Sequence, residues 1–471
     1  MKKIFIYALL MAGLFMPFGC KKQLDKLPDN AKVEGNAITD QPSAIVALNG
    51  VYFRFANASN TRTDWSVNQI MGGRFSGYLV DATGNGGAND EINAFDNTGY
   101  ISQWGRYYSL VNAANGVIGA VEGLADNKFV AGKKQQILGE ARFLRAYGHF
   151  KLLSYFGQWF DVNSAYGVII QDQFITLTNK DKARGTVKEC YDFILTDIDY
   201  AIANAPVTGP NVYAGKWTAM ALKMRVLLSR GQGDDYAQTV TLANSIINEG
   251  PYALEPNLRD LFYTKGLAST EVMLGIKPQA NQDQVYENMS GNFIGRSFIY
   301  GANQNLINLY NNDPRKAWII GTQYRTSAFN YFIKFVQPTR ISTVVSETAY
   351  AFRLTEVYLM QAEAMVRSGG ALAPAKTRLK EVLSKSGLTD FTAVDAANTT
   401  DELLRQIYLE YVRNMVGEDG IEWMALLRLP FAMVQQLRPT ITNKIQYILP
   451  IPKAEFLQNP KTGEQNPGYS R

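Results

Sequence analysis

Apolar residues recur at helical spacing over most of the chain. Ala44, Leu48, Val51, Tyr52 and Phe55 lie 4, 3, 1 and 3 positions apart, which predicts a helix with one apolar face. A capping residue and an early proline, in Thr39-Asp40-Gln41-Pro42, mark its start. Further helices are predicted by apolar series within residues 137–155, 191–202, 217–228, 234–248, 354–358, 375–383 and 404–415.

Two long stretches interrupt this helical pattern. Residues 57–99 are crowded with Asn, Gly, Asp and Ser, and residues 250–345 with aromatic residues, Asn and Gly. Such compositions favour loops and short strands over long helices. Between them, successive helices with short turns predict antiparallel pairs of the tetratricopeptide type, without a strict 34-residue period. The sequence therefore predicts a mainly α scaffold with degenerate helix pairs and two irregular insertions.

The first twenty residues have the pattern of an export signal. Lys2 and Lys3 precede an apolar run at 4–18, which ends at Gly19 and Cys20. This pattern predicts a signal peptide over 1–19, and the cysteine at its end resembles a bacterial lipobox. Acyl chains on Cys20 would anchor the protein to a membrane. A lipidated tether is then expected over 20–38 and a single domain over 39–471.

Composition removes several classes of function. The 471 residues are 46% hydrophobic with a net charge of +5, which excludes a disordered chain. Basic residues form no long run, so nucleic acid is not an expected partner. His149 is the one histidine, and Cys20 and Cys190 are the two cysteines, too few for a Cys/His zinc site. His149 and Cys190 fall on predicted helices, where we interpret them as packed residues and not as catalytic ones.

No cofactor or metal is expected. The loop that starts at Asp81 has Ile92 where an EF-hand needs its bidentate Glu, which rejects that motif. A looser calcium site that uses Asp81, Asn85, Asp90 or Glu91 remains an alternative to a solvated turn.

Motifs of one known family follow each other along the chain. Leu-Asp-Lys-Leu-Pro stands at 24–28 after Cys20, and Ala-Leu-Asn-Gly-Val-Tyr stands at 47–52. The most specific motif is Glu-Ala-Arg-Phe-Leu-Arg-Ala-Tyr at 140–147. Others lie at 104–118, 216–228, 313–315, 353–364 and 449–469. In this order, over essentially its whole length, the chain resembles the SusD/RagB family of outer-membrane lipoproteins from Bacteroidetes.

One motif departs from the family pattern. Family members commonly have Glu-Gly-x-Arg-x-x-Asp-Leu near the C-terminal helix, whereas residues 419–426 read Asp-Gly-Ile-Glu-Trp-Met-Ala-Leu. The Arg and Asp would lie three residues apart on a helix, so their joint replacement is consistent with the loss of one ion pair. This difference indicates a divergent member with the same fold.

The resemblance implies binding and not catalysis. Members of the family lie at the cell surface, lipid-anchored in the outer membrane, as lids on SusC-type TonB-dependent transporters. They hold a glycan, or sometimes a peptide, for import. Their scaffold has four tetratricopeptide-like helix pairs and an inserted variable region that carries the ligand site. The two irregular insertions of this chain would form that region.

Candidate ligand residues are chosen from the composition of the insertions. A sugar site needs flat aromatic faces with a polar rim that bonds the hydroxyl groups. The candidates are Trp65, Asn68, Tyr78, Asp81 and Asn89 in the first insertion and Tyr286, Arg296 and Tyr300 in the second. Each of them can instead be a packing residue.

Three other functions remain open. The chain could be an oligopeptide-binding member of the same family or a scaffold that binds only proteins. It could also be a surface glycoside hydrolase, which needs two carboxylates across a cleft, for example Asp81 and Asp90.

Overall fold

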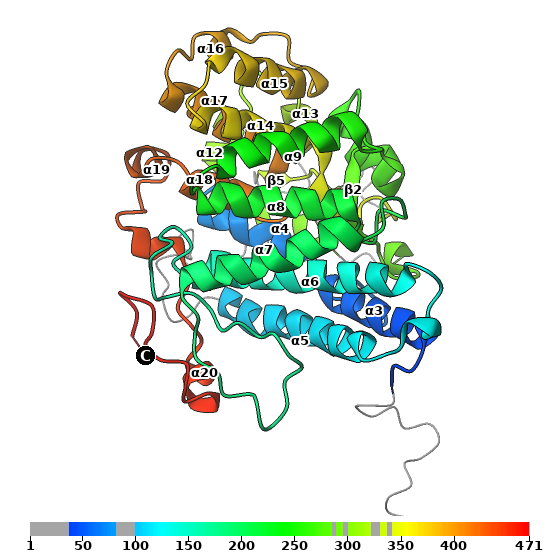
Figure 1. The fold of residues 1–471 in the computed structure, drawn as a ribbon. Coiled ribbons are helices and arrows are strands. Elements are labelled where there is room, and N and C mark those ends of the chain that lie inside the picture. Colours follow the sequence, from blue (N-terminus) through cyan, green and yellow to red (C-terminus); the bar gives the residue numbers. More distant parts are fainter. Residues whose placement is uncertain are drawn as a thin grey trace, which may run out of the picture.

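The computed structural model describes residues 37–81, 99–284, 289–294, 300–321, 330–336 and 342–470. The predicted signal peptide, Cys20 and most of the tether lie outside these residues. Helices dominate, and the expected mainly α fold is confirmed (Figure 1). The helices of the scaffold are α3 (Gln41–Phe55), α5 (Gln103–Glu122), α6 (Lys133–Phe156), α7 (Val187–Asn204), α8 (Lys216–Arg230), α9 (Asp235–Glu249), α14 (Leu354–Arg367), α15 (Leu372–Lys385) and α17 (Thr400–Met415).

The scaffold is a stack of neighbouring helices. Helix α6 packs between α5 and α7, α8 packs between α7 and α9, and α14 packs between α9 and α15 (Figure 1). Each helix hides one apolar face against the next, so burial of these faces stabilises the stack. This arrangement confirms the degenerate helix pairs that the periodicity predicts.

Helix α3 begins where the sequence predicts. The Asp40 carboxylate accepts from the Ser43 N–H at 3.0 Å, and Ser43 in turn bonds the Asp40 N–H, which makes a capping box. Pro42 occupies the first turn, where its missing N–H costs nothing. The buried residues of α3 are the five of the predicted apolar face.

Helix α4 (Ser66–Phe75) lies inside the first insertion, where the composition predicted loops and short strands. Its sequence holds Gly72, Gly73 and two side-chain amides, which are poor or moderate helix formers. All residues from Asn68 to Phe75 are buried, so tertiary packing overrides the low local propensity.

The remaining elements are short. In the first insertion and in the second one they are β1 (Leu79–Asp81), η2 (Gly99–Ser102), α10 (Leu258–Asp260), η4 (Leu261–Lys265), η5 (Gly266–Ala268), β2 (Val272–Ile276), η6 (Gln282–Gln284), α11 (Gly291–Ile294), β3 (Tyr300–Ala302), α12 (Gln304–Leu309), α13 (Lys316–Ile319), β4 (Ile320–Gly321) and β5 (Tyr331–Phe332). Elsewhere they are η3 (Asp126–Lys128), β6 (Ala349–Arg353), α16 (Thr392–Asp395), α18 (Ile421–Leu427), α19 (Phe431–Leu437), η7 (Lys444–Tyr447) and α20 (Lys453–Gln458). Apart from α4, the insertions have the short elements that their composition predicts.

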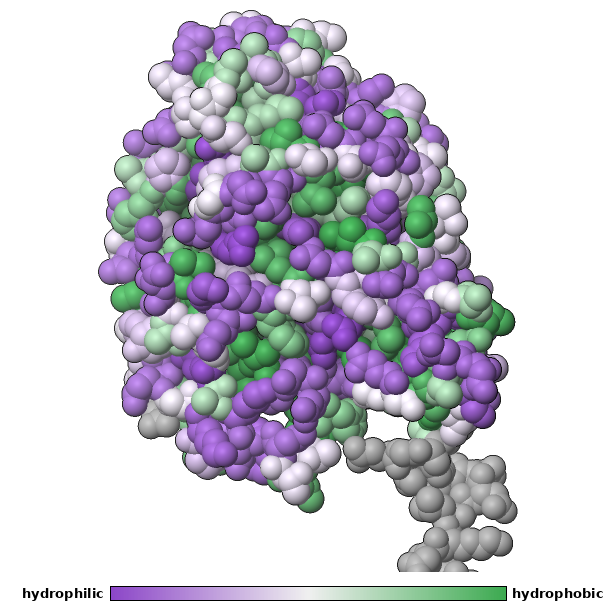
Figure 2. Space-filling view, viewed as in Figure 1, coloured by the Kyte–Doolittle hydropathy of each residue, from purple (hydrophilic) through white to green (hydrophobic). Residues whose placement is uncertain are grey.

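Two small sheets accompany the helices. Strand β2 pairs antiparallel with β6 and joins the second insertion to the start of α14. The other sheet has the strand order β1-β3-β5-β4. On the face in Figure 2, apolar residues are scattered among hydrophilic ones. Among the described residues, no helix is long and apolar enough to cross a bilayer.

Candidate functional site

The two irregular insertions meet in the four-stranded sheet. Strand β1 comes from the first insertion and pairs antiparallel with β3 from the second, with Leu79 opposite Ala302 and Asp81 opposite Tyr300. The Asn303 N–H donates to the Tyr78 carbonyl at 2.9 Å and extends the pairing by one bond. Asp81 and Tyr300 are 219 positions apart in the sequence, and the sheet makes them direct cross-strand neighbours.

The other candidate ligand residues are divided between the core and undescribed segments. Trp65, Asn68 and Tyr78 are 1%, 2% and 6% exposed. Asn89, Tyr286, Arg296 and the side chain of Asp81 lie outside the described part of the chain. Tyr300 is half-buried at the end of β3. The structure therefore brings Asp81 and Tyr300 together, and a ligand role for the remaining candidates stays a prediction.

The three buried candidates have partners within the protein. The Trp65 ring packs edge-on against Phe55 at 5.2 Å, and the Tyr78 and Tyr408 hydroxyls lie 3.3 Å apart. Burial raises the pKa of Tyr78, so its hydroxyl stays neutral. Asn68 donates to the Asp419 carboxylate at 2.9 Å. Trp65 and Tyr78 are thus 1% and 6% exposed and leave no open ring face for a sugar.

A buried cluster of charges has Asp419 at its centre. Its carboxylate accepts from the Tyr147 hydroxyl and from the Lys151 and Arg225 side chains, each at 2.8 Å. Arg225 also binds Glu356 at 2.6 Å. Burial alone would raise the pKa of Asp419, but the Lys151 and Arg225 charges hold it below its ordinary value. The charges of the cluster are paired with each other and nearly buried, an arrangement that is suited to holding helices together.

His149 and Cys190 are packed residues, as predicted. His149 Nδ1 lies 3.0 Å from the Arg145 carbonyl, and its Nε2 accepts from the Gln171 N–H at 3.1 Å. Burial lowers the pKa of His149 to about 3, so the ring is neutral and both nitrogens are engaged. Cys190 is a buried free thiol whose pKa burial raises to about 11. Neither side chain is placed to act as a base or nucleophile.

Within the described ranges, no group of three or more His, Cys, Asp or Glu side chains could hold a metal. The side chains of the alternative calcium site, Asp81, Asn85, Asp90 and Glu91, are not among those described. That alternative therefore stays untested.

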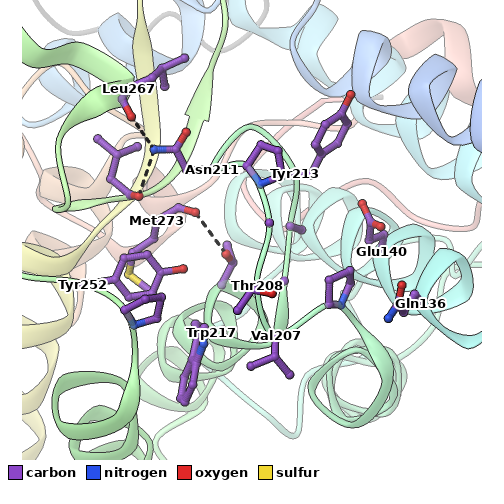
Figure 3. Close-up of a pocket in the computed structure, with 18 of the residues that line it drawn as sticks. Gln136, Glu140, Val207, Thr208, Asn211, Tyr213, Trp217, Tyr252, Leu267 and Met273 are labelled. Atoms are coloured by element: carbon purple, nitrogen blue, oxygen red, sulfur yellow. Dashed lines mark hydrogen bonds between the residues drawn. The ribbon is translucent and has the colours of Figure 1, made fainter. Parts of the chain in front are cut away.

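The structure also contains a large pocket that the sequence did not indicate. It has a volume of about 840 Å³ and lies between α3, the start of α6, the 205–215 loop and β2 (Figure 3). Asn211 fixes the loop, because its side-chain amide donates to the Leu267 carbonyl at 2.8 Å and its backbone carbonyl accepts from the Gly275 N–H at 2.7 Å. The signal available in the sequence was the Pro206–Pro210 segment, which must leave the helical path between α7 and α8.

Comparisons with known proteins identify the class. A family model described as "Starch-binding associating with outer membrane" matches residues 22–228, and the SusD family model matches residues 300–469. The chain is therefore a SusD-like protein, and it belongs to the SusD/RagB family.

Two relatives show how far the sequence has diverged. A SusD-like protein of Bacteroides ovatus is 24% identical over 262 residues, which cover 54% of this chain and 46% of that protein. SusD-like protein P2 of Formosa agariphila is 23% identical over 483 residues, which cover 90% of this chain and 92% of that one. The chain thus spans about half the length of the first relative and most of the second.

Solved structures confirm the fold. A SusD superfamily protein from Bacteroides thetaiotaomicron is 22% identical with a TM-score of 0.74, over 91% of this chain and 100% of that one. A laminarin-binding SusD-like protein is 19% identical with a TM-score of 0.72, over 92% and 100%. NanU of B. fragilis is 18% identical with a TM-score of 0.74, over 94% and 100%.

Proposed function

We propose that this protein binds a glycan on the surface where its two insertions meet and delivers it to a SusC-type TonB-dependent transporter. The observation that carries the proposal is the pairing of β1 with β3, which places Asp81 opposite Tyr300. Family membership and a laminarin-binding structural neighbour support a carbohydrate ligand. The protein is a carrier and not an enzyme, anchored in the outer membrane through Cys20 and exposed at the cell surface.

The chemistry of the paired residues suits a sugar. A tyrosine ring covers the C–H face of a pyranose with little loss of side-chain entropy, and a carboxylate accepts from adjacent hydroxyl groups. Both come from paired strands of one sheet, which fix the two backbones next to each other.

Substitution of Tyr300 tests the site. We expect Tyr300→Ala to weaken glycan binding about tenfold, the equivalent of 1.4 kcal/mol, because it removes one stacking face. Binding is measured by affinity electrophoresis and calorimetry against laminarin, starch and other plant, host and microbial polysaccharides. Tyr358, half-buried on α14, supplies the control Tyr358→Ala, which should bind like the wild type.

Two results would contradict the proposal. One is that the wild type retains no polysaccharide but retains peptides. The other is release of reducing ends during incubation, which would indicate a hydrolase. Unchanged glycan binding by Tyr300→Ala would show that the protein binds the glycan at a place other than β3.

One end of the molecule suits a docking surface for the transporter. Leu177 and Leu457 are 90% and 85% exposed there, on the 170–186 loop and on α20. The two segments are joined, because Lys180 donates to the Gln458 carbonyl and Asn459 to the Lys182 carbonyl. The described chain begins before α3 at the same end (Figure 1). A lipid tether attached there would hold these leucines near the membrane, where the transporter lies.

A charge at these leucines should weaken the partnership. We expect Leu177→Asp with Leu457→Asp to reduce co-purification with the transporter at least fivefold, because both apolar side chains are lost from the contact. Val344→Asp is the control, since Val344 is 54% exposed but lies in another loop. If the double variant co-purified with the transporter as well as the wild type does, the transporter would dock on another face of the protein.

A further inference from the structure

The pocket of Figure 3 is separate from the proposed glycan site. Its lining shares no residue with β1, β3, β4 or β5. Lys133, Gln136 and Glu140 line it from α6, at positions that fall on one face of the helix. Figure 3 shows Gln136 and Glu140 on one side of the pocket, next to Tyr213 of the 205–215 loop, and Tyr252 and Met273 on the other side.

Glu140 is the unusual group in this pocket. Its side chain lines the pocket although the residue is only 5% exposed. Oε2 accepts from the Tyr52 hydroxyl at 2.7 Å, and that hydroxyl in turn accepts from the Ala214 N–H at 2.8 Å. Within the described chain, Oε1 has no hydrogen bond and the carboxylate has no ion pair. Burial raises the pKa of Glu140 to about 7, although the Tyr52 bond and the Lys133 charge oppose the shift.

Most other buried carboxylates have a cation within the protein. Asp197 pairs with Arg145, Glu356 with Arg225, Glu363 with Arg428 and Glu410 with Arg315, at distances of 2.6 or 2.7 Å. These pairs offset the cost of burying a charge. Glu347 and Glu422 also lack an ion pair within the described ranges, but neither lines this pocket. Glu140 is thus a buried acid whose missing cation can enter from solvent.

A metal ion is a poor candidate for that cation. No cluster of three acidic, His or Cys side chains occurs in the described ranges, and one carboxylate gives Ca²⁺ too few oxygen ligands. An ammonium group needs less, namely a carboxylate and nearby aromatic rings. The Tyr52 hydroxyl bonds the carboxylate. The Tyr213 ring packs edge-on against the Tyr52 ring, with 4.9 Å between the ring centroids, and Tyr213 is 40% exposed.

We propose that this pocket is a second binding site, which takes a ligand through a primary ammonium group held by Glu140. Lys133 is seven residues earlier on the same face of α6, about 10 Å along the helix axis. It also lines the pocket, so its ammonium group can bind the carboxylate of a short peptide whose amino end is held by Glu140. The ammonium group could equally belong to an amino sugar. This proposal does not depend on the glycan site.

Calorimetry with four small probes tests the proposal on the purified full-length protein in detergent. Trialanine and glucosamine carry the ammonium group, whereas N-acetyl-trialanine and N-acetylglucosamine lack it. We expect at least one amine to bind and its acetylated form to bind at least tenfold more weakly. Binding of trialanine alone would assign the site to peptides, and binding of glucosamine alone to amino sugars. Failure of both amines, or equal binding of the acetylated forms, would overturn the proposal.

Glu140→Gln provides the matched variant. Glutamine keeps an oxygen for the Tyr52 hydroxyl, so the fold should be retained, but amine affinity should fall at least tenfold. Glu249→Gln is the control, because Glu249 is exposed at the end of α9. Unchanged amine binding by a folded Glu140→Gln variant would overturn the role of this carboxylate, and unchanged laminarin binding would show that the glycan site is intact.

The pH profile adds a second readout. The carboxylate must be ionised to hold an ammonium group, so wild-type affinity should rise as pH increases from 5.5 to 7.5. The other titratable groups near the carboxylate are Tyr52, Tyr213 and Lys133, and burial raises the pKa of Tyr52 further above its ordinary value. Glu140→Gln should remove this dependence. A wild-type profile that is flat over this interval would contradict the proposal.

Discussion

Replacement of Asp419 by alanine should destabilise the fold by about 3–5 kcal/mol. The substitution removes the carboxylate that the Lys151 and Arg225 cations share in the interior. Arg225 keeps its pair with Glu356, whereas Lys151 loses the one ion pair that it makes in the described part of the chain. It also removes the acceptor of the Asn68 amide and the Tyr147 hydroxyl. Loss of one partner from a buried ion pair typically costs this much, because the remaining charge is desolvated and unpaired.

Urea unfolding measures the effect on Asp419→Ala. Glu249→Ala should change the free energy of unfolding by less than about 0.5 kcal/mol, since Glu249 is exposed and unpaired with any cation in the described ranges. A loss below about 1 kcal/mol for Asp419→Ala would mean that water or a neighbouring carboxylate compensates the cations. The interpretation of Asp419 as the centre of the cluster would then be wrong.

The residues that made the fold predictable are mostly of this buried kind. Arg145, Arg315 and Arg353 belong to the motifs that resemble the SusD/RagB family, and each is a buried cation of an ion pair. A buried charge needs a partner at a fixed place, so such residues constrain the framework. They carry information on the scaffold and none on the ligand. This is why these arginines indicated the family but not the residues that bind the glycan.

The insertions could be predicted only in part, for a different physical reason. Their Asn- and Gly-rich composition correctly indicated short elements, but Trp65 and Asn68 lie next to or within a buried helix. Whether an aromatic side chain faces solvent or the core there depends on partners such as Phe55 and Asp419, which are distant in sequence. The pairing of Asp81 with Tyr300 likewise needs the fold, because local sequence does not set the register of strands so far apart.

The divergent motif at 419–426 shows the same limit. The replacement of the Arg and Asp of the family pattern there is consistent with the loss of one ion pair. The structure adds that Glu422 is fully enclosed and that burial raises its pKa to about 7. A local comparison of residues could not show this, because the enclosure comes partly from α4, some 350 positions earlier.

The contact between α4 and this motif leads to the second large effect, which we expect for Gly72→Ala. A Cβ atom at position 72 would lie 2.5 Å from the Gly420 Cα and 3.2 Å from the Glu422 carboxylate. Gly420 cannot retreat easily, because it has a φ of +71° and follows the immobilised Asp419. We therefore expect Gly72→Ala to lower the free energy of unfolding by about 3 kcal/mol, as overpacking against backbone does.

Gly105→Ala is the matched control, since nothing lies within 4 Å of its Cβ position in α5, and it should stabilise by about 0.5–1 kcal/mol. If both variants were as stable as the wild type in urea, α4 would not pack closely against residues 419–422, and the way the first insertion is fixed to the scaffold would need revision.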